Sequence, residues 1–366
     1  MKENLGLITL EGSKELALKV DSYLQEWRRP EKSFIIPSEC PRFGSGESKG
    51  LVKESVRGKD IYILTDVCNY SITYSMYGQK NHMSPDDHYQ DLKRIIAAVG
   101  GHAEKIRVIM PFLYESRQHK KSSRESLDCS LALQELSNMG VYGILTFDAH
   151  DPRVQNATPL NSVENIRPTY QFVKTLFKTV PDLKLDPEHL MIISPDEGAM
   201  ERGIFLSGVL GVNTGMFYKR RDYSKIINGK NPIIAHEFLG NSIDGLDVIV
   251  IDDMISSGES MLDVCTQLKQ KNAKRIFVMA TFGLFTNGLD QFDEAFEDGL
   301  IDGVFTTNCI YQTPELLKRD WYCNVDMSEY IASIIDSLNN DYSISDLINP
   351  SKRIKLAVEE YKKKHY

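Results

Sequence analysis

The feature that most constrains the fold is a series of short, continuous apolar runs along the chain. They occupy residues 61–64, 106–110, 144–147, 190–193, 248–251, 276–280 and 304–305 and are bounded by Gly, Asp or Asn. Strands buried on both faces of a parallel sheet have this continuous pattern, whereas half-exposed strands alternate. Amphipathic helical patterns, such as residues 260–271, lie between the runs. This alternation predicts an α/β fold with mainly parallel sheets flanked by helices.

The length of the chain predicts two compact domains, because 366 residues exceed what one hydrophobic core usually organises. The pattern of residues changes near positions 158–167, and we place the boundary between the domains there. We therefore expect domains at 1–165 and 166–340 and a charged C-terminal extension at 341–366. The polar stretch 218–245 predicts a long loop or hairpin, and the lysines after residue 352 are expected on a solvated helix face or tail.

Charge and cysteine content exclude several classes of function. The formal net charge of −8 argues against nucleic-acid binding, which needs a surplus of Lys and Arg. The six cysteines form no CxxC unit, so we expect reduced thiols rather than a zinc site. The chain starts without the apolar run of a signal peptide and has no run long enough to cross a bilayer. A soluble cytoplasmic protein, with no membrane partner, is expected.

The strongest local motif spans residues 248–260. An apolar strand ends in Asp252 and Asp253, and a Ser/Gly-rich loop and a helix follow. The N-terminus of such a helix offers backbone N–H groups and a favourable dipole to an anion, at the strand end where α/β sheets bind ligands. The carboxylates can accept hydrogen bonds from a ribose diol, and the groups expected to hold a sugar monophosphate belong to Ser256, Ser257, Gly258 and Ser260. A capped strand–turn–helix without a ligand is the alternative, which the acidic pair disfavours.

This motif resembles the phosphoribosyl-binding fingerprint of type I phosphoribosyltransferases and of phosphoribosyl pyrophosphate synthases, also called ribose-phosphate pyrophosphokinases. The motif alone does not separate the two groups, since one consumes the product of the other. Residues 54–60, Glu-Ser-Val-Arg-Gly-Lys-Asp, are similar to a stretch of the synthases. The synthase resemblance, which covers residues 5–340, implies two tandem type I phosphoribosyltransferase-like domains.

Two N-terminal segments resemble the ATP-binding segments of the synthases. Residues 42–47, Arg-Phe-Gly-Ser-Gly-Glu, are similar to the family's Arg-Phe-Ser-Asp-Gly-Glu, which holds the adenine of ATP from a neighbouring subunit. The resemblance implies this role for Phe43 and Glu47, with Ser45 in place of Asp. Residues 77–101 form a longer segment than in the family.

Residues 111–121 resemble the family's Pro-Tyr-x-x-Tyr-Ala-Arg-Gln-Asp-Arg-Lys, whose Arg-Gln pair contacts ATP. The resemblance implies that Arg117 and Gln118 bind ATP, with His119 in place of Asp. A planar guanidinium suits phosphate oxygens or stacks on a base, although an isolated surface Arg often forms only a salt bridge.

Two further segments resemble the family's metal-binding segments. Residues 145–150 are similar to a strand that ends in Asp-Leu-His, whose His lies near the catalytic metal. Residues 194–202 resemble Ser-Pro-Asp-x-Gly-Gly-x-x-Arg, in which the Asp helps to hold Mg²⁺ and the following loop binds pyrophosphate. The resemblance implies that His150 and Asp196 help to place Mg²⁺. Ala199 replaces the second Gly but keeps its N–H donor.

Residues 82–88, which hold two histidines and two aspartates, could suggest another metal site. A helix start with Ser84 as N-cap and Pro85 at the first position is the interpretation that we favour.

Residues 219–221, Lys-Arg-Arg, resemble the start of the family's mobile catalytic loop, which implies catalytic roles for Lys219 and Arg221. A solvated basic run is the alternative. Ser256 and Glu259 depart from the family's pattern, where Asp and Gly are usual, and we expect Glu259 to point outward.

The resemblance implies a Mg²⁺-dependent ribose-phosphate diphosphokinase. Such an enzyme transfers the β,γ-diphosphoryl group of ATP to the anomeric hydroxyl of ribose 5-phosphate, giving phosphoribosyl pyrophosphate and AMP. It also implies a homo-oligomer, since the family forms hexamers built from dimers. A non-catalytic regulatory homologue and a type I phosphoribosyltransferase with an added domain stay open as alternatives.

Overall fold

The computed structural model describes residues 4–221 and 233–365, and the chain divides into two compact units. Unit 1 comprises Met1–Pro168, Asn308–Tyr311 and Asp326–Asn349. Unit 2 comprises Thr169–Thr307, Gln312–Val325 and Pro350–Tyr366. The first division lies close to the expected boundary at 165. The units are not continuous beyond it, because two segments that follow strands of unit 2 return to unit 1.

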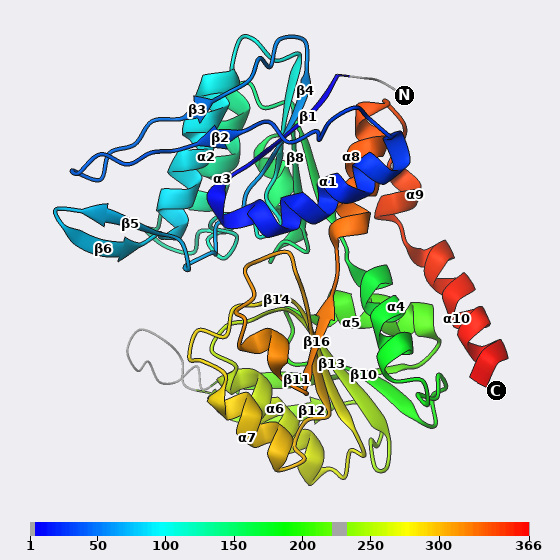
Figure 1. The fold of residues 1–366 in the computed structure, drawn as a ribbon. Helices are drawn as coiled ribbons and strands as arrows, with labels where there is room; N and C mark the ends of the chain where they lie inside the picture. Colours follow the sequence, from blue (N-terminus) through cyan, green and yellow to red (C-terminus); the bar gives the residue numbers. More distant parts are fainter. Residues whose placement is uncertain (1–3, 222–232, 366) are drawn as a thin grey trace. The chain divides into compact units, whose positions relative to one another are not determined.

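Unit 1 is built on a five-stranded parallel sheet in the order β1–β4–β7–β8–β9 (Figure 1). The strands are β1 (Leu5–Thr9), β4 (Asp60–Leu64), β7 (Lys105–Ile109), β8 (Gly143–Phe147) and β9 (Ser162–Ile166). The three central strands agree with the predicted apolar runs, since all but one of their residues are buried. The sequence did not predict the two edge strands, and β9 occupies the stretch in which we placed the domain boundary.

The helices of unit 1 are α1 (Lys14–Arg28), α2 (Pro85–Val99), α3 (Asp128–Asn138), α8 (Ser328–Asn339) and α9 (Ser345–Ile348), with short 3-10 helices at Glu11–Ser13 and Pro152–Ala157. The apolar faces of α2 and α3 pack on alternate residues of the central strands, such as Ile61 and Ile63. Helices α1 and α8 lie against each other (Figure 1) and share an ion pair of 2.7 Å between Arg28 Nε and Asp336 Oδ1.

The helix start predicted at residues 84–85 is confirmed. The Ser84 side chain accepts a hydrogen bond from the Asp87 N–H, and the Asp87 side chain accepts one from the Ser84 N–H. This reciprocal capping satisfies two donors that the first turn would otherwise leave free. Two small antiparallel sheets complete the unit: β2 (Ser38–Glu39) pairs with β3 (Leu51–Val52), and β5 (Thr73–Met76) pairs with β6 (Gln79–His82).

Unit 2 is built on a seven-stranded sheet in the order β12–β11–β10–β13–β14–β15–β16. The strands are β10 (Leu190–Ser194), β11 (Asn213–Arg221), β12 (Ile233–Leu239), β13 (Asp247–Ile255), β14 (Ile276–Gly283), β15 (Gly303–Thr307) and β16 (Tyr322–Val325). Every pair is parallel except β11 and β12, which form the hairpin predicted for the polar stretch 218–245.

Strand β13 is longer than predicted, since the apolar run was expected to end at residue 251. It continues to Ile255, so Asp252 and Asp253 lie inside the strand rather than at its end. The reason is its pairing with β14, which extends to Ile255 opposite Gly283 and uses the backbone groups that a loop would leave free.

The helices of unit 2 are α4 (Thr169–Thr179), α5 (Met200–Leu210), α6 (Glu259–Gln270), α7 (Asp290–Glu297) and α10 (Ser351–His365), with a short 3-10 helix at Leu316–Lys318. Alternate residues of each strand face two apolar clusters. Met191 and Val250, for example, pack with α6 and α7, whereas Ile192 and Ile249 pack with α4, α5 and α10. Burial on both faces explains the continuous apolar runs.

The charged C-terminal stretch is a helix, α10, with one buried face. Ile354, Val358 and Tyr361 pack into unit 2, and the Tyr361 hydroxyl donates to the carbonyl of Leu183 at 3.0 Å. In the described part of the chain, no helix is both long and apolar enough to span a bilayer.

Candidate functional site

Three carboxylates gather at the carboxyl edge of the unit 2 sheet. Strands β10 and β13 are neighbours with Ile193 opposite Val250, so Asp196, just beyond β10, lies near Asp252 of β13. Burial raises the pKa of Asp252 well above its usual range, and the negative charges of Asp253 and Asp196 raise it further. Crowded carboxylates of this kind favour a ligand that brings hydrogen-bond donors or a cation.

The loop between β13 and α6, residues 256–258, is fixed by hydrogen bonds that its carbonyl groups accept. The carbonyl of Ser256 accepts the Thr286 N–H at 2.9 Å, and the carbonyl of Ser257 accepts the side-chain amide of Gln291. Within the described residues, the N–H groups of Ser257, Gly258 and the first three helical residues, 259–261, make no hydrogen bond. These free donors at a helix N-terminus are suited to an anion.

Gly258 occupies a position that only glycine fits. Its φ angle is +95°, in the left-handed region, and a Cβ at this position would overlap the ring of Phe292. Phe292 is fully buried beneath the loop. The loop geometry is therefore imposed by the packed core of unit 2 as well as by its own residues.

The side chain of Glu259 is exposed, as expected, and accepts a hydrogen bond from Asn287 Nδ2 at 3.1 Å. This contact with the loop after β14 holds the carboxylate at the outer side of the first helical turn. The replacement of glycine by Glu259 therefore leaves the N–H groups of the loop accessible.

The loop between β10 and α5 is organised by Asp196. Its Oδ1 accepts the N–H of Gly198 at 2.9 Å and the N–H of Ala199 at 3.3 Å. The φ angle of Ala199 is −86°, a conformation open to any residue, and its methyl group is buried. The replacement of glycine by Ala199 thus causes no backbone strain in this loop.

Lys219 and Arg221 belong to the β11 part of the hairpin, where the backbone of Lys219 lies opposite His236. The register shifts between Arg220 and Arg221, which marks a bulge at the end of the pairing. The side chains of Lys219 and Arg221 and residues 222–232 lie outside the described residues, so their catalytic role stays a prediction.

In unit 1, the predicted adenine-binding residues form an exposed turn at residues 43–47. The Phe43 N–H donates to the Glu47 carbonyl at 2.7 Å, and the Gly46 N–H donates to the Phe43 carbonyl at 2.9 Å. Phe43 is 52% exposed, and the Glu47 side chain accepts a hydrogen bond of 2.9 Å from the Ser45 hydroxyl. Ser45, in place of the family's Asp, thus supplies a donor beside Glu47 rather than a second negative charge.

The segment after β7, which contains Arg117 and Gln118, packs on helix α2. The ring of Tyr114 stacks on Tyr89 with centroids 4.2 Å apart. Arg117 is exposed. Burial raises the pKa of the Cys68 thiol well above its usual range, and the positive charge of Arg117 opposes this shift. The Gln118 side-chain amide donates to the Ser126 carbonyl at 2.8 Å and so closes its own loop.

His150 follows β8, and its ring centroid lies 5.4 Å from that of His119. His119 Nε2 lies 3.3 Å from Asp151 Oδ2, and the pKa of Asp151 is held below its usual range chiefly by Arg153. His119, in place of the family's Asp, therefore has an acidic partner of its own.

No set of three or more His, Cys, Asp or Glu side chains among the described residues is placed to hold a metal ion. His150 belongs to unit 1 and Asp196 to unit 2. Mg²⁺ often uses only one or two protein carboxylates, with waters and substrate phosphates as the other ligands. Asp196, which lies close enough to Asp252 to raise its pKa, offers a carboxylate of the kind that such an ion uses.

Sequence reasoning missed the residues that support these loops. Gln291, Phe292 and Asn287 hold the loop at 256–258 and its neighbour Glu259, yet they lie more than twenty residues further along the chain. It also missed Asp66, a buried carboxylate that accepts the N–H groups of Cys68 and Tyr311 at 2.8 and 2.7 Å. Only the tertiary fold brings these residues to their places, so no local pattern identifies them.

Two family models match the chain in order. Residues 5–140 match the N-terminal domain of ribose phosphate pyrophosphokinase, and residues 225–349 match the phosphoribosyl synthetase-associated domain. The chain is 27% identical over 309 residues to a ribose-phosphate pyrophosphokinase of Mycoplasma genitalium, covering 84% of this chain and 85% of that protein. It is 26% identical over 313 residues to one of Vibrio parahaemolyticus, covering 84% and 90%.

Among solved structures, the fold is similar to that of a phosphoribosylpyrophosphate synthetase from Mycobacterium smegmatis. The TM-score is 0.75 at 21% sequence identity, and the likeness covers 93% of this chain and 100% of that one. The predicted α/β fold with parallel sheets is thereby confirmed.

Proposed function

The chain belongs to the ribose-phosphate pyrophosphokinase family, and we propose that it forms phosphoribosyl pyrophosphate and AMP from ribose 5-phosphate and ATP. The observation that carries this conclusion is the similarity to ribose-phosphate pyrophosphokinases over 84% of the chain and 85–90% of their length. The N-terminal match disfavours a phosphoribosyltransferase with an added domain, because it covers the half of the chain that holds the predicted ATP residues.

Ribose 5-phosphate would bind at the carboxyl edge of the unit 2 sheet. The free N–H groups of the loop at 256–258 and the hydroxyls of Ser256, Ser257 and Ser260 support a role in binding its phosphate. Asp252 and Asp253 would accept hydrogen bonds from the sugar hydroxyls. The raised pKa of Asp252 supports this role, because a bound diol adds donors to the Asp253 N–H that its carboxyl group already accepts.

ATP would be bound by residues of unit 1. The exposed Phe43 ring offers a stacking surface for adenine, and Glu47 offers an acceptor for its amino group. The exposed Arg117 would pair with phosphate oxygens. Gln118 would keep this segment folded through its bond to Ser126 as well as contact the nucleotide.

Mg²⁺ would be held beside Asp196, with a contribution from His150, and would supply positive charge to the phosphates when bound. The chain's own contribution to the reaction is mainly positioning and charge. The anomeric hydroxyl oxygen attacks the β-phosphorus of ATP. The bond from that phosphorus to the oxygen shared with the α-phosphorus breaks, and AMP leaves with this oxygen. The hydroxyl proton passes to solvent. Lys219 and Arg221 would stabilise the negative charge that develops on the transferred group.

The active form would be a homo-oligomer, as the resemblance implies for a turn that serves a neighbouring subunit. We also propose a cytoplasmic location, where both substrates are supplied.

The test mixes the purified protein with Mg²⁺, ATP and ribose 5-phosphate and follows both products. AMP and phosphoribosyl pyrophosphate should form in equal amounts. Lys219→Ala should lower kcat by about 10³-fold or more and change KM for ATP little, as expected for a cation that acts in the transition state. Arg220→Ala, in the same basic run, is the matched control and should retain activity.

Absence of AMP formation, with ATP still bound in calorimetry, would replace this proposal with the regulatory homologue. An unchanged kcat in Lys219→Ala would remove Lys219 from the mechanism.

A further inference from the structure

We propose that the hairpin formed by β5 and β6 holds the adenine-binding turn at residues 43–47 and that Tyr74 is a positioning residue for ATP. The inference rests on the proposed role of Phe43 and Glu47 in ATP binding. The second strand of the hairpin lies in the segment 77–101, which the resemblance described above implies to be longer than in the family.

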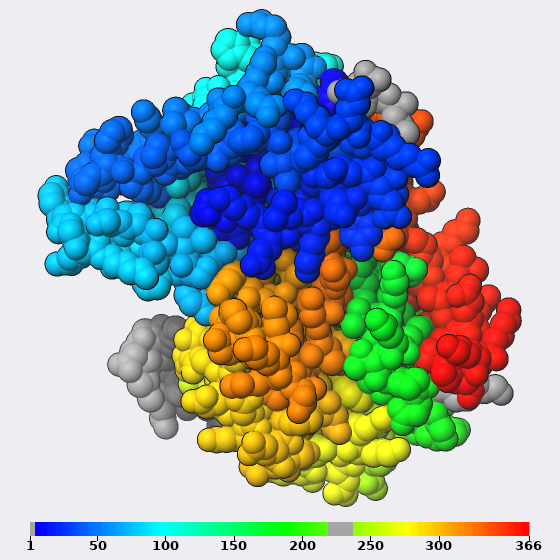
Figure 2. Space-filling view, in the orientation of Figure 1, coloured from blue at the N-terminus to red at the C-terminus, as the bar shows by residue number. Residues whose placement is uncertain are grey.

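The turn at 43–47 makes few hydrogen bonds to the rest of unit 1. Among the described residues, the hydrogen bonds made by residues 43–47 stay within the turn, with one exception that goes to the hairpin. In Figure 2 the blue segment that carries the turn and the lighter blue hairpin project together from the same side of unit 1. A turn that projects in this way needs a second element to fix its position.

The tip of the hairpin contacts the turn at two residues. The Tyr77 N–H donates to the carbonyl of Gly44 at 2.9 Å. Gly46 has a φ angle of +93°, and a Cβ there would lie only 2.6 Å from the sulfur of Met76. The hairpin thus packs directly on the backbone of the turn.

The base of the turn is fixed by Arg42, whose side chain is 10% exposed. Its guanidinium lies over the ring of Tyr74, 4.7 Å from the centroid, and Nη2 lies 3.0 Å from Asp91 Oδ2. The Tyr74 hydroxyl donates to Asp87 Oδ1 at 3.4 Å. Tyr74 of the hairpin and two carboxylates of α2 therefore enclose the residue that precedes Phe43.

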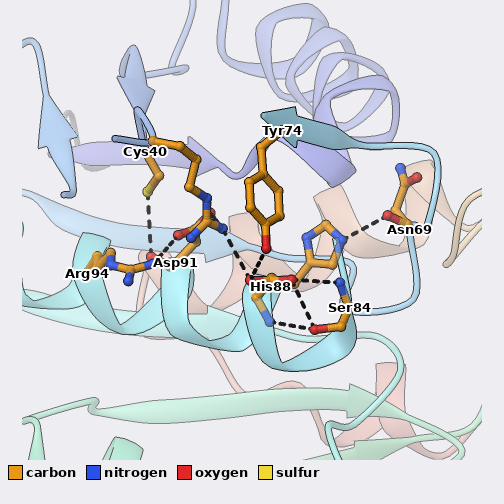
Figure 3. A network of polar contacts seen from close by, with 9 residues as sticks. Cys40, Asn69, Tyr74, Ser84, His88, Asp91 and Arg94 are labelled. Carbon is orange, nitrogen blue, oxygen red and sulfur yellow. Dashed lines mark hydrogen bonds and ion pairs between the residues drawn. The ribbon is translucent and has the colours of Figure 1, made fainter. Parts of the chain in front are cut away.

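The charged side chains around Tyr74 lie close to partners of opposite charge. Figure 3 shows the Tyr74 ring pointing from the hairpin towards α2, between Asp91 and His88. Arg94 also binds Asp91, at 2.6 Å, so Arg42 and Arg94 face the two carboxylates of α2. Arg42, Tyr74 and His88 are among the residues that border a cavity of about 380 Å³.

His88 adds no charge to this network. Its Nε2 donates to the Asn69 carbonyl at 2.8 Å, and burial lowers its pKa, so the ring is neutral. Removal of the Tyr74 ring would leave the charges in place and take away the surface on which Arg42 rests. The effect expected is a looser turn, not an electrostatic change.

A turn that is ordered before ATP binds saves the ordering that binding would otherwise require. Loosening it should weaken ATP binding and leave the ribose 5-phosphate loop of unit 2 unaffected. Tyr74 would therefore act on KM for ATP through Arg42, without touching the nucleotide.

The experiment compares Tyr74→Ala with Tyr74→Phe, which keeps the ring, and with Lys80→Ala, an exposed change on the same hairpin. Two quantities are measured: hydrogen exchange of the Phe43 and Gly46 amides without substrate, and steady-state kinetics. In Tyr74→Ala we expect faster exchange and a KM for ATP raised about tenfold, with kcat and KM for ribose 5-phosphate within about twofold. The other two variants should stay close to the unchanged protein.

Unchanged exchange in Tyr74→Ala would overturn the proposal whatever reaction the protein catalyses. Faster exchange with an unchanged KM for ATP would overturn the link to ATP. If the unchanged protein forms no phosphoribosyl pyrophosphate, the proposed function fails, and the exchange experiment alone decides whether the hairpin holds the turn. If Tyr74→Ala does not fold, Met76→Ala tests the tip contact by the same two measurements, with a smaller expected change.

Discussion

The phosphate loop of unit 2 and the adenine-binding turn of unit 1 are held in place in opposite ways. The loop at 256–258 connects a buried strand to a helix and rests on the buried ring of Phe292. The turn at 43–47 is exposed, and the β5–β6 hairpin provides its contact outside the turn. The first takes its geometry from the core of its unit, and the second takes it from an accessory element.

This difference has a consequence for mutation. A change in the loop at 256–258 disturbs the packed core and the ligand site together, because the same residues serve both. A change in the turn at 43–47 should alter ligand binding and leave stability almost unchanged, since few of its atoms are buried. The following predictions test this contrast.

The largest effect is expected for Gly258→Ala. The added methyl group would overlap Phe292 and strain a backbone with φ of +95°, so the loop must move. We expect kcat/KM for ribose 5-phosphate to fall about 100-fold or more and the thermal midpoint to fall as well. The control is Gly288→Ala, where φ is +85° but a Cβ meets open space. Equal losses in both variants would show that backbone strain, not contact with the core, controls the loop.

A smaller, purely nucleotide-dependent effect is expected for Phe43→Ala. Loss of the exposed ring should raise KM for ATP roughly tenfold, since stacking of a base on an aromatic side chain contributes about 1–3 kcal/mol. KM for ribose 5-phosphate and the thermal midpoint should not change. Phe43→Tyr keeps a ring and should behave like the unchanged protein. A drop in the thermal midpoint of Phe43→Ala would contradict the contrast between the two regions.

A third measurement concerns the pH dependence of stability through Asp66 of unit 1. Burial raises the pKa of Asp66 from its usual value of 3.8 to about 7, although two N–H donors oppose the shift. Between these values the folded protein binds more protons than the unfolded one. The free energy of unfolding should therefore fall as pH rises from about 4 to about 7, by up to about 4 kcal/mol, and then level off.

Urea unfolding at pH 5 and pH 7.5 measures this dependence. Asp66→Asn should flatten it, because the neutral amide does not titrate. A variant that keeps the full dependence would assign it to other groups.

The smallest effect is expected for Glu259→Gln. The side chain is exposed and bound to Asn287, so its charge should act weakly on the loop. We expect KM for ribose 5-phosphate to change by less than about threefold. A tenfold fall in this KM would show instead that the carboxylate faces the bound phosphate.

The sequence predicts the central strands of both sheets because burial on two faces demands continuous apolar runs. It fails for β9, whose sequence Ser-Val-Glu-Asn-Ile is only partly buried at the edge of its sheet. It also ends β13 too early, since pairing with β14 keeps Asp252 and Asp253 in the strand in spite of their low intrinsic preference for strands.

The candidate site could be predicted only in part. The register of β10 and β13 explains why Asp196 and Asp252 lie together, yet this register follows from the order of strands in the sheet. The contact between Arg42 and Asp91 joins residues 49 positions apart, so it leaves no local pattern. Tyr77 and Gly78 form the turn of a polar hairpin whose contact with Gly44 depends on the tertiary fold.

The return of residues Asn308–Tyr311 and Asp326–Asn349 to unit 1 also bears on how the protein is made. A ribosome releases the first 168 residues early, but α8, the partner of α1, leaves it only after every strand of the unit 2 sheet. Helix α10, which closes unit 2, leaves it later still. Domains usually mature one after the other from the N-terminus. Here neither unit can be completed before residues 308–365 have left the ribosome, so both depend on the same late stretch of the chain.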